Sequence, residues 1–174
     1  MNCESLNSIQ RDCSSAIGGI RPKIYIGDSN AVDWEGATFD SIEEFLIETL
    51  TTSEAFEEIE FRNNVGSLEE TYSLDNDGAI VFEQTLSLPI HGRDASKSRK
   101  ITVMASGQRL LDIVVQQNDG KYVYLREVTL SEVGEGTGTE KTEGSKYALT
   151  FTGQSEHLSY FIDKDAIEGL VNPE

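Results

Sequence analysis

The chain has 174 residues, and its 14 Lys and Arg residues are outnumbered by 31 Asp and Glu residues, which gives a net charge of −17. This length suits one domain that buries its core without a metal or disulfide. The charge argues against binding to nucleic acid or to an anionic membrane, because both need clustered Lys and Arg. Aromatic residues make up 8% of the chain, so the acidity is that of a folded domain rather than a disordered tail.

Residues 1–20 are polar and end in two glycines and Ile20, which predicts an arm ahead of the domain. The start has no signal-peptide pattern, and no apolar run reaches the ~20 residues that cross a bilayer. Cys3 and Cys13 lack a CxxC spacing, which favours two free thiols over a small disulfide loop. The domain itself is expected over residues 21–165, followed by a polar tail over 166–174.

Alternating apolar residues predict a strand at 22–27, and a turn-rich loop with the only Trp follows at 28–36. Residues 41–50 fit either a helix or a strand. Their apolar spacing and a possible cap at the first residue are helical, whereas three nearby Thr residues favour a strand. Residues 55–62 alternate as a strand does. Eight acidic residues and no basic one fall between positions 39 and 61.

A long hairpin is predicted from the segments 68–74 and 79–88, which flank the turn Asp75-Asn-Asp-Gly78. Pro89 is expected to end the second strand, because it has no N–H group for the ladder. The segment that follows holds an unusual share of the basic residues, and Asp94 can cap a helix over about 95–106.

The rest of the chain again has the pattern of a sheet. The turn Asn118-Asp-Gly120 predicts a second hairpin, and residues 134–144 form a Gly-rich loop. Tyr147, Leu149 and Phe151 share one face of the last clear strand. Further strands are expected at 109–117, 121–126, 128–133, 146–152 and 159–162.

Six or more strands that mostly follow one another predict antiparallel pairing. The expected fold is therefore mainly β: a small antiparallel β-barrel or sandwich with one flanking α-helix, a long hairpin and an N-terminal arm. No pattern indicates an enzyme, a cofactor or a metal site. His91 and His157 lie outside any HExxH motif, no GxSxG is present, and no two acids are singled out as a glycosidase pair.

The second half of the chain combines four motifs: Asp119-Gly-Lys-Tyr-Val-Tyr-Leu125, the Gly- and Thr-rich stretch 134–144, Ser145-Lys-Tyr-Ala-Leu-Thr-Phe-Thr-Gly153 and Tyr160-Phe-Ile162. Together they resemble the C-terminal half of tail tube proteins of phages that infect Bacteroides-like bacteria. The stretch from Cys3-Glu-Ser-Leu-Asn7 to Ile20 also looks like the N-terminal arm of those proteins. Arg126-Glu-Val128 departs from that pattern, which has a Gly-containing turn there. A tube-like ring protein of a short-tailed, crAss-like phage can carry the same fold.

This resemblance implies a virion structural protein that is made in the host cytoplasm and resides in the tail. Copies of such a barrel form rings, usually hexameric, which stack into a channel for genomic DNA and contact other tail or connector proteins. Neighbouring barrels pair edge to edge, while arms and a long hairpin bridge successive rings. Contacts between subunits are therefore expected at Ser5, Leu6, Ile9, Glu70, Tyr72, Leu74, Asp75, Asp77, Ile80 and Phe82.

The acidity fits such a channel, because acidic side chains repel the phosphates of DNA and let it pass without being held. We expect the lumen to be lined by Glu57, Glu60, Glu69 and Glu83. The cations of the 93–100 segment are expected to meet acidic patches of neighbouring subunits instead: Arg93, Lys97, Arg99 and Lys100.

Two other functions stay open at this stage. A tube protein of a contractile injection or type VI secretion system has a similar barrel but different partners, namely sheath and spike proteins. A monomeric carbohydrate-binding β-sandwich is the third hypothesis. Such modules usually expose two or three aromatic side chains on one face, whereas here the aromatics mostly alternate into the expected core and Trp34 stands alone.

Overall fold

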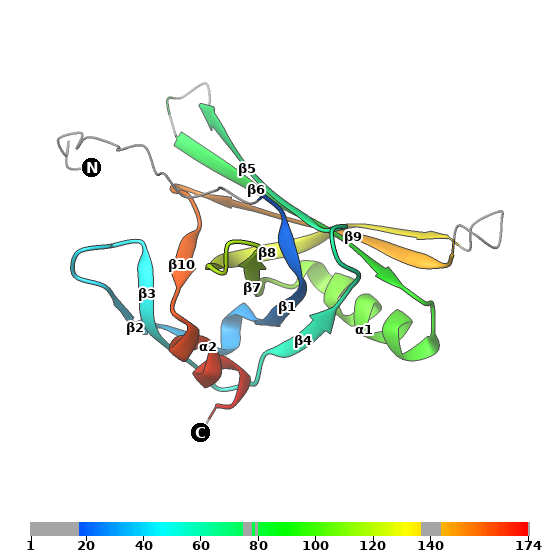
Figure 1. Cartoon of the computed structure of the whole chain (residues 1–174), viewed down its shortest axis with the longest axis horizontal. Helices are drawn as coiled ribbons and strands as arrows, with labels where there is room; N and C mark the ends of the chain where they lie inside the picture. Colours follow the sequence, from blue (N-terminus) through cyan, green and yellow to red (C-terminus); the bar gives the residue numbers. More distant parts are fainter. Residues whose placement is uncertain (1–17, 75–77, 79, 137–143, 174) are drawn as a thin grey trace.

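A computed structural model describes residues 18–74, 78, 80–136 and 144–173. In this part of the chain ten strands form a curled mixed sheet, which two α-helices and two short 3-10 turns accompany (Figure 1). The elements are β1 (Ile20–Asp28), β2 (Val32–Phe39), β3 (Leu46–Thr52), β4 (Glu57–Glu60), β5 (Ser67–Leu74), β6 (Ile80–His91), α1 (Ala95–Ala105), β7 (Leu111–Gln117), β8 (Tyr122–Gly136), β9 (Lys146–Ser155), β10 (Tyr160–Ile162) and α2 (Lys164–Val171).

Strand β8 belongs to two parts of this sheet. Its first half lies in the order β2-β3-β10-β8-β7-β1-β4, which we call the seven-strand part. Its second half pairs with β9, which continues through β6 to β5, and we call this the hairpin part. All pairs are antiparallel except β3 with β10. The mainly β fold expected from the sequence is confirmed, although two helices are present where one was expected.

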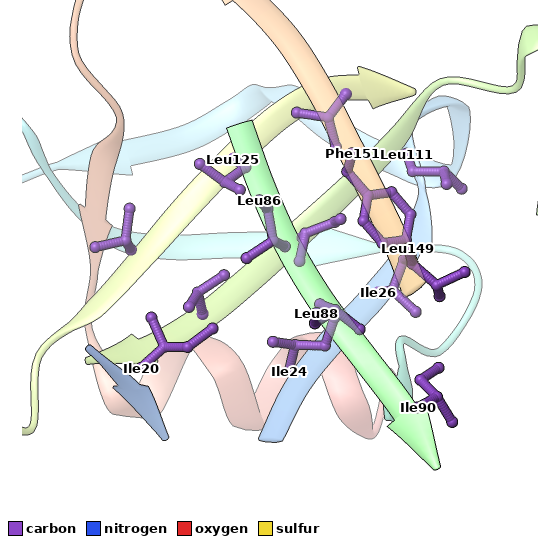
Figure 2. Packing of buried hydrophobic residues seen from close by; sticks show 14 of the residues in the cluster. Ile20, Ile24, Ile26, Leu86, Leu88, Ile90, Leu111, Leu125, Leu149 and Phe151 are labelled. Atoms are coloured by element: carbon purple, nitrogen blue, oxygen red, sulfur yellow. The ribbon is translucent and has the colours of Figure 1, made fainter. Parts of the chain in front are cut away.

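The main core lies between the two parts. Leu86, Leu88 and Ile90 of β6 lie across Ile24 and Ile26 of β1 (Figure 2), and each of these side chains is at least nine-tenths buried. The face that the sequence predicts for the last long strand is confirmed, because the following residues of β9 are buried in this cluster: Tyr147, Leu149 and Phe151. Helix α1 closes one side of the core with Ile101.

A second core lies on the other face of the seven-strand part. Helix α2 covers Ile47 and Tyr124 with its buried residues Ala166, Ile167 and Leu170. The expectation of a polar tail over residues 166–174 is therefore wrong for most of that segment. Its apolar residues recur at helical spacing, and Asp163 caps the helix by accepting a hydrogen bond from the Asp165 N–H.

Helix α1 confirms the expected helix, since the Asp94 carboxylate accepts the Lys97 N–H at 2.8 Å. For residues 41–50, where the sequence fits a helix or a strand, the structure has a strand in the second half of the segment, because β3 begins at Leu46. The Asp40 carboxylate accepts the N–H groups of Ile42 and Glu43, as a helix cap would, but the Asp40 N–H donates to Leu46 O, which closes a connection between the paired strands β2 and β3.

The expectation that Pro89 ends its strand is wrong, because β6 continues to His91 and pairs with β9 throughout. The Gly92 N–H donates to Ser145 O, and the backbone N–H groups of alternate residues in a strand point to the same side. The N–H groups of Ile90 and Leu88 therefore also face β9. The nitrogen of Pro89 therefore points to the opposite side. There the ladder with β5 has already ended at Ser87, so no hydrogen bond is lost.

The expected strands 121–126 and 128–133 are one strand, β8, which also includes residues 134–136 of the expected Gly-rich loop. Its change of direction falls at Glu127, whose φ of 54° is rare for a residue with a side chain. Buried Asp112 fixes this point: its carboxylate accepts the Glu127 N–H at 2.8 Å and the Tyr124 hydroxyl at 2.5 Å.

Candidate assembly surfaces

The hairpin of β5 and β6 projects from the body of the molecule (Figure 1). Its two strands pair without interruption from Ser67 opposite Ser87 to Leu74 opposite Ile80. Side chains alternate along each strand, so one face of the hairpin carries Leu68, Glu70, Tyr72, Leu74, Ile80, Phe82, Gln84 and Leu86. This face is apolar at Leu68 and Leu86 beside the main core, polar at the Glu70–Gln84 pair, and apolar again at its outer end.

The outer end of this face is exposed. Tyr72 and Leu74 keep 59% and 61% of their surface in contact with solvent, and the Tyr72 ring packs against Phe82 with 5.7 Å between centroids. Ile80 and Phe82 are partly buried. Four of the expected contact residues thus form one apolar surface, which we call the hairpin tip: Tyr72, Leu74, Ile80 and Phe82. The remaining expected contacts Ser5, Leu6, Ile9, Asp75 and Asp77 lie outside the described residues.

Glu70 is the one expected contact residue that the structure places in an internal network. Its carboxylate accepts the N–H and the hydroxyl of Ser159, at 2.8 and 2.6 Å, and the Ser159 hydroxyl also contacts buried Gln84. These bonds join the hairpin to the chain before β10. Because Ser159 is 89 positions away, no local pattern in the sequence could have indicated this role.

The four acids expected at a lumen do not lie together. Glu69 and Glu83 are exposed on the polar face of the hairpin, opposite Thr85 and Thr71. Glu57 and Glu60 are exposed on β4, which is the outermost strand of the seven-strand part. The Glu57 carboxylate is also paired with Lys100 of α1 at 2.5 Å. The hairpin pair thus lies on one surface, and Glu57 and Glu60 lie elsewhere, along β4.

Cations of the 93–100 segment already make contacts within their own chain. Lys97 pairs with Asp94 at 3.2 Å and donates to two backbone carbonyls, and Lys100 pairs with Glu57. The Arg93 guanidinium lies 5.7 Å from the Tyr147 ring. Arg99 is exposed on α1. Lys97 and Lys100 are thus already paired with acids of the same chain.

Several strand edges are open in the described part of the chain. In the hairpin part, β5 pairs only with β6, and the second half of β8 pairs only with β9. In the seven-strand part, β2 and β4 are the two outermost strands. An open edge presents unpaired N–H and C=O groups, which pair readily with another chain.

The expectation that Trp34 stands alone is wrong. Its indole packs against Phe39, Tyr124 and Tyr160, with centroids 5.6 to 5.9 Å apart, and the Arg126 guanidinium lies 4.5 Å from its ring. Phe45 extends this group by contacting Tyr160. We call these residues the aromatic cluster: Trp34, Phe39, Phe45, Tyr124 and Tyr160. They come from four segments of the chain, so the spacing within any one segment could not predict it.

Across residues 18–74, 78, 80–136 and 144–173, His, Cys, Asp and Glu side chains nowhere gather in a group of three or more that could hold a metal ion. None of the helices in these ranges has the length and apolarity needed to cross a membrane. No family model matches the chain, and no curated protein matches it. The resemblance to tail tube proteins therefore stays a prediction.

Proposed function

We propose that the chain is a virion structural protein, a subunit that assembles with copies of itself into rings of the phage tail tube type. The observation that carries this proposal is the hairpin tip, where Tyr72 and Leu74 stand exposed beside Phe82 and Ile80 at the outer end of the hairpin. Exposed apolar surface is unfavourable in water, whereas a contact with a neighbouring subunit removes it from solvent.

The open edges of the hairpin part support the same proposal. This part has the order β5-β6-β9-β8, so its two open edges lie at opposite ends. Pairing of β5 in one copy with the second half of β8 in the next would repeat one contact from copy to copy. Such a head-to-tail contact closes into a ring when the rotation between copies permits it. A closed ring of this kind is the tail-tube-type barrel arrangement that the resemblance implies.

The net charge of −17 supports a channel that DNA passes through without being bound. Glu69 and Glu83, which share the polar face of the hairpin, are the acids that we place toward the lumen. In this proposal the protein is made in the host cytoplasm, resides in the virion tail and contacts other tail or connector proteins. No catalytic step is assigned to it.

Light scattering of the purified protein tests the role of the hairpin tip. Wild type is expected to have a mass several times that of one chain, and Tyr72→Ser combined with Leu74→Ser is expected to give monomers. The matched control is Thr71→Ala combined with Ser73→Ala on the opposite face of the same strand, which should assemble as wild type does. Unchanged assembly of the Tyr72 and Leu74 variant contradicts the assigned role.

A tube subunit of a contractile injection or type VI secretion system would use the same hairpin tip and edges. Genome neighbours separate this alternative from a phage tail. Genes for sheath and spike proteins beside this one support the injection system, whereas genes for capsid and connector proteins support the phage tail.

Carbohydrate binding is a second candidate function, which the aromatic cluster favours. Phe39 and Phe45 are 36% and 47% exposed, and both contact Tyr160, so neighbouring rings are available on the surface for stacking. A glycan array is the direct test. Glycan binding that Phe45→Ala abolishes, with assembly intact, supports this candidate, and an array without any signal rejects it.

A further inference from the structure

A groove of about 660 Å³ runs between β4 and helix α1. Its floor is apolar and includes Ile59 of β4 with Ile101 and Met104 of α1. Ile101 is buried, and Ile59 and Met104 are only partly covered by the main core. One wall is thus β4, which is an edge strand of the seven-strand part, and the other wall is α1. Figure 1 shows the two elements side by side.

The backbone of β4 has an open side. The Phe61 N–H donates to Pro22 O, so it points toward β1. N–H and C=O groups of alternate residues point to the same side of a strand, so Ile59 and Glu57 also face β1. The N–H and C=O groups of Glu58 and Glu60 therefore point away from β1, toward the open edge. Both residues line the groove.

The strand wall carries excess negative charge. Glu54, Glu57, Glu58 and Glu60 line it, whereas Lys97, Arg99, Lys100 and Arg109 line the rest of the groove. Side chains alternate along β4, so Glu58 and Glu60 lie on the face of the strand opposite Ile59, away from α1, and Glu58 pairs there with Lys23. A second copy of β4 is a poor partner for this edge, because Glu side chains would face one another across the ladder. The edge therefore fits a strand that carries positive charge.

We propose that this groove binds an extended segment of another protein, with apolar residues alternating with Lys or Arg, which adds a strand to β4. Its backbone pairs with Glu58 and Glu60, its apolar side chains lie on the floor beside Ile59 and Met104, and its cations lie beside the Glu58 and Glu60 side chains on the opposite face of β4, away from the cations of α1. Strand addition at an exposed edge is an established way in which peptides are recognised. This inference does not depend on self-assembly, because one chain holds the complete groove.

The ion pair between Lys100 and Glu57 crosses the groove. Both side chains are more than 60% exposed, so water already screens them, and their separation opposes binding only weakly. Glu57 lies on the same face of β4 as Ile59, so this pair borders the apolar floor and leaves the Glu58 and Glu60 face free for the cations of the bound segment.

Fluorescence anisotropy with two labelled heptapeptides tests the proposal, one of alternating Val and Lys and one of alternating Val and Glu. The Val-Lys peptide is expected to bind wild type at least about tenfold more tightly than the Val-Glu peptide. Glu58→Pro removes an N–H on the open edge only, and should weaken binding about tenfold relative to Glu58→Ala, which loses the same carboxylate. Circular dichroism verifies that both variants are folded.

If Glu58→Pro does not fold, hydrogen exchange on wild type tests whether the peptide pairs with the open edge of β4. Saturating Val-Lys peptide should slow exchange at the amides of Glu58 and Glu60, while the amide of Thr71 on the distant hairpin keeps its rate. Equal binding of the two peptides, equal binding by folded Glu58→Pro and Glu58→Ala, or unprotected amides at these two residues overturns the proposal. So does an absence of binding at about 1 mM peptide.

Discussion

At the scale of single residues, Asp112 holds the point at which β8 leaves the seven-strand part of the sheet and enters the hairpin part. The carboxylate is 1% exposed and holds the Glu127 N–H at the point where the strand changes direction. Burial raises the pKa of the Asp112 carboxyl, and hydrogen bonds from the Glu127 N–H and the Tyr124 hydroxyl oppose this only in part. The sheet thus contains an acid whose charged form is disfavoured by its surroundings.

This raised pKa makes the contribution of Asp112 depend on pH. The contribution is complete below the unfolded value of about 3.8 and is lost as the pH rises through the folded-state pKa. Urea unfolding of wild type and Asp112→Asn should therefore show the advantage of wild type shrinking as the pH rises from about 4 through the folded-state pKa. The decrease should be about 1.4 kcal/mol for each pH unit between the two pKa values.

The control for this measurement is Ser131→Ala at an exposed position of β8, a substitution that adds and removes no titratable group and should show no comparable trend. An advantage of wild type over Asp112→Asn that is constant or grows with pH would contradict the raised pKa.

Gly27 is a second residue whose identity the fold requires. A Cβ atom at this position would lie 2.4 Å from two ring carbons of Phe56, which is itself 3% exposed. Gly27→Ala should lower the free energy of unfolding by about 1–3 kcal/mol, because the buried ring has to move. Chemical denaturation measures this. Gly136→Ala is the matched control, since nothing lies within 4 Å of its added Cβ atom, and an equal effect of both substitutions would refute the explanation.

At the scale of elements, the sequence predicted best those features that neighbouring residues determine. The turns at 75–78 and 118–120 indicated hairpins, and the described strands on either side of both turns pair as expected. Asp94 likewise indicated the start of α1. These signals are local, because a turn or a cap involves residues only two or three positions apart.

Features that depend on distant partners could not be predicted in this way. Pro89 is tolerated within β6 only because β5 ends before it, and Glu70 has its partner in Ser159. The aromatic cluster likewise joins strand and loop residues that the sheet brings together, such as Trp34 and Tyr160. The roles of such residues are set by the topology of the sheet rather than by their neighbours along the chain.

Helix α2 is the element whose importance was most underestimated from the sequence. Leu170 is fully buried against the seven-strand part, and the Phe56 N–H ahead of β4 donates to its carbonyl. Leu170→Ala should lower the free energy of unfolding by about 2–5 kcal/mol, through lost burial and a cavity. Exposed Glu168 on the same helix supplies the control, Glu168→Ala, which should change stability little. A Leu170→Ala protein as stable as this control would mean that α2 does not hold the second core.

At the scale of the whole molecule, acidity and exposed apolar surface occur together. A charge of −17 keeps copies apart unless specific contacts outweigh the repulsion. The hairpin tip and the open edges of β5 and β8 supply such contacts in the proposed ring. Repulsion between acidic subunits weakens in salt, so ring formation is expected to be more complete as ionic strength rises.

The central claim is that copies of this chain form a ring around a channel. Negative-stain electron microscopy of the purified protein, at low and at physiological salt, tests it most directly. We predict rings or stacked tubes with an open centre, and a cryo-electron microscopy map of these particles should place Glu69 and Glu83 toward that centre. Separate particles of single-chain size under all conditions would contradict the claim, as would a channel lined mainly by Arg93, Lys97, Arg99 and Lys100.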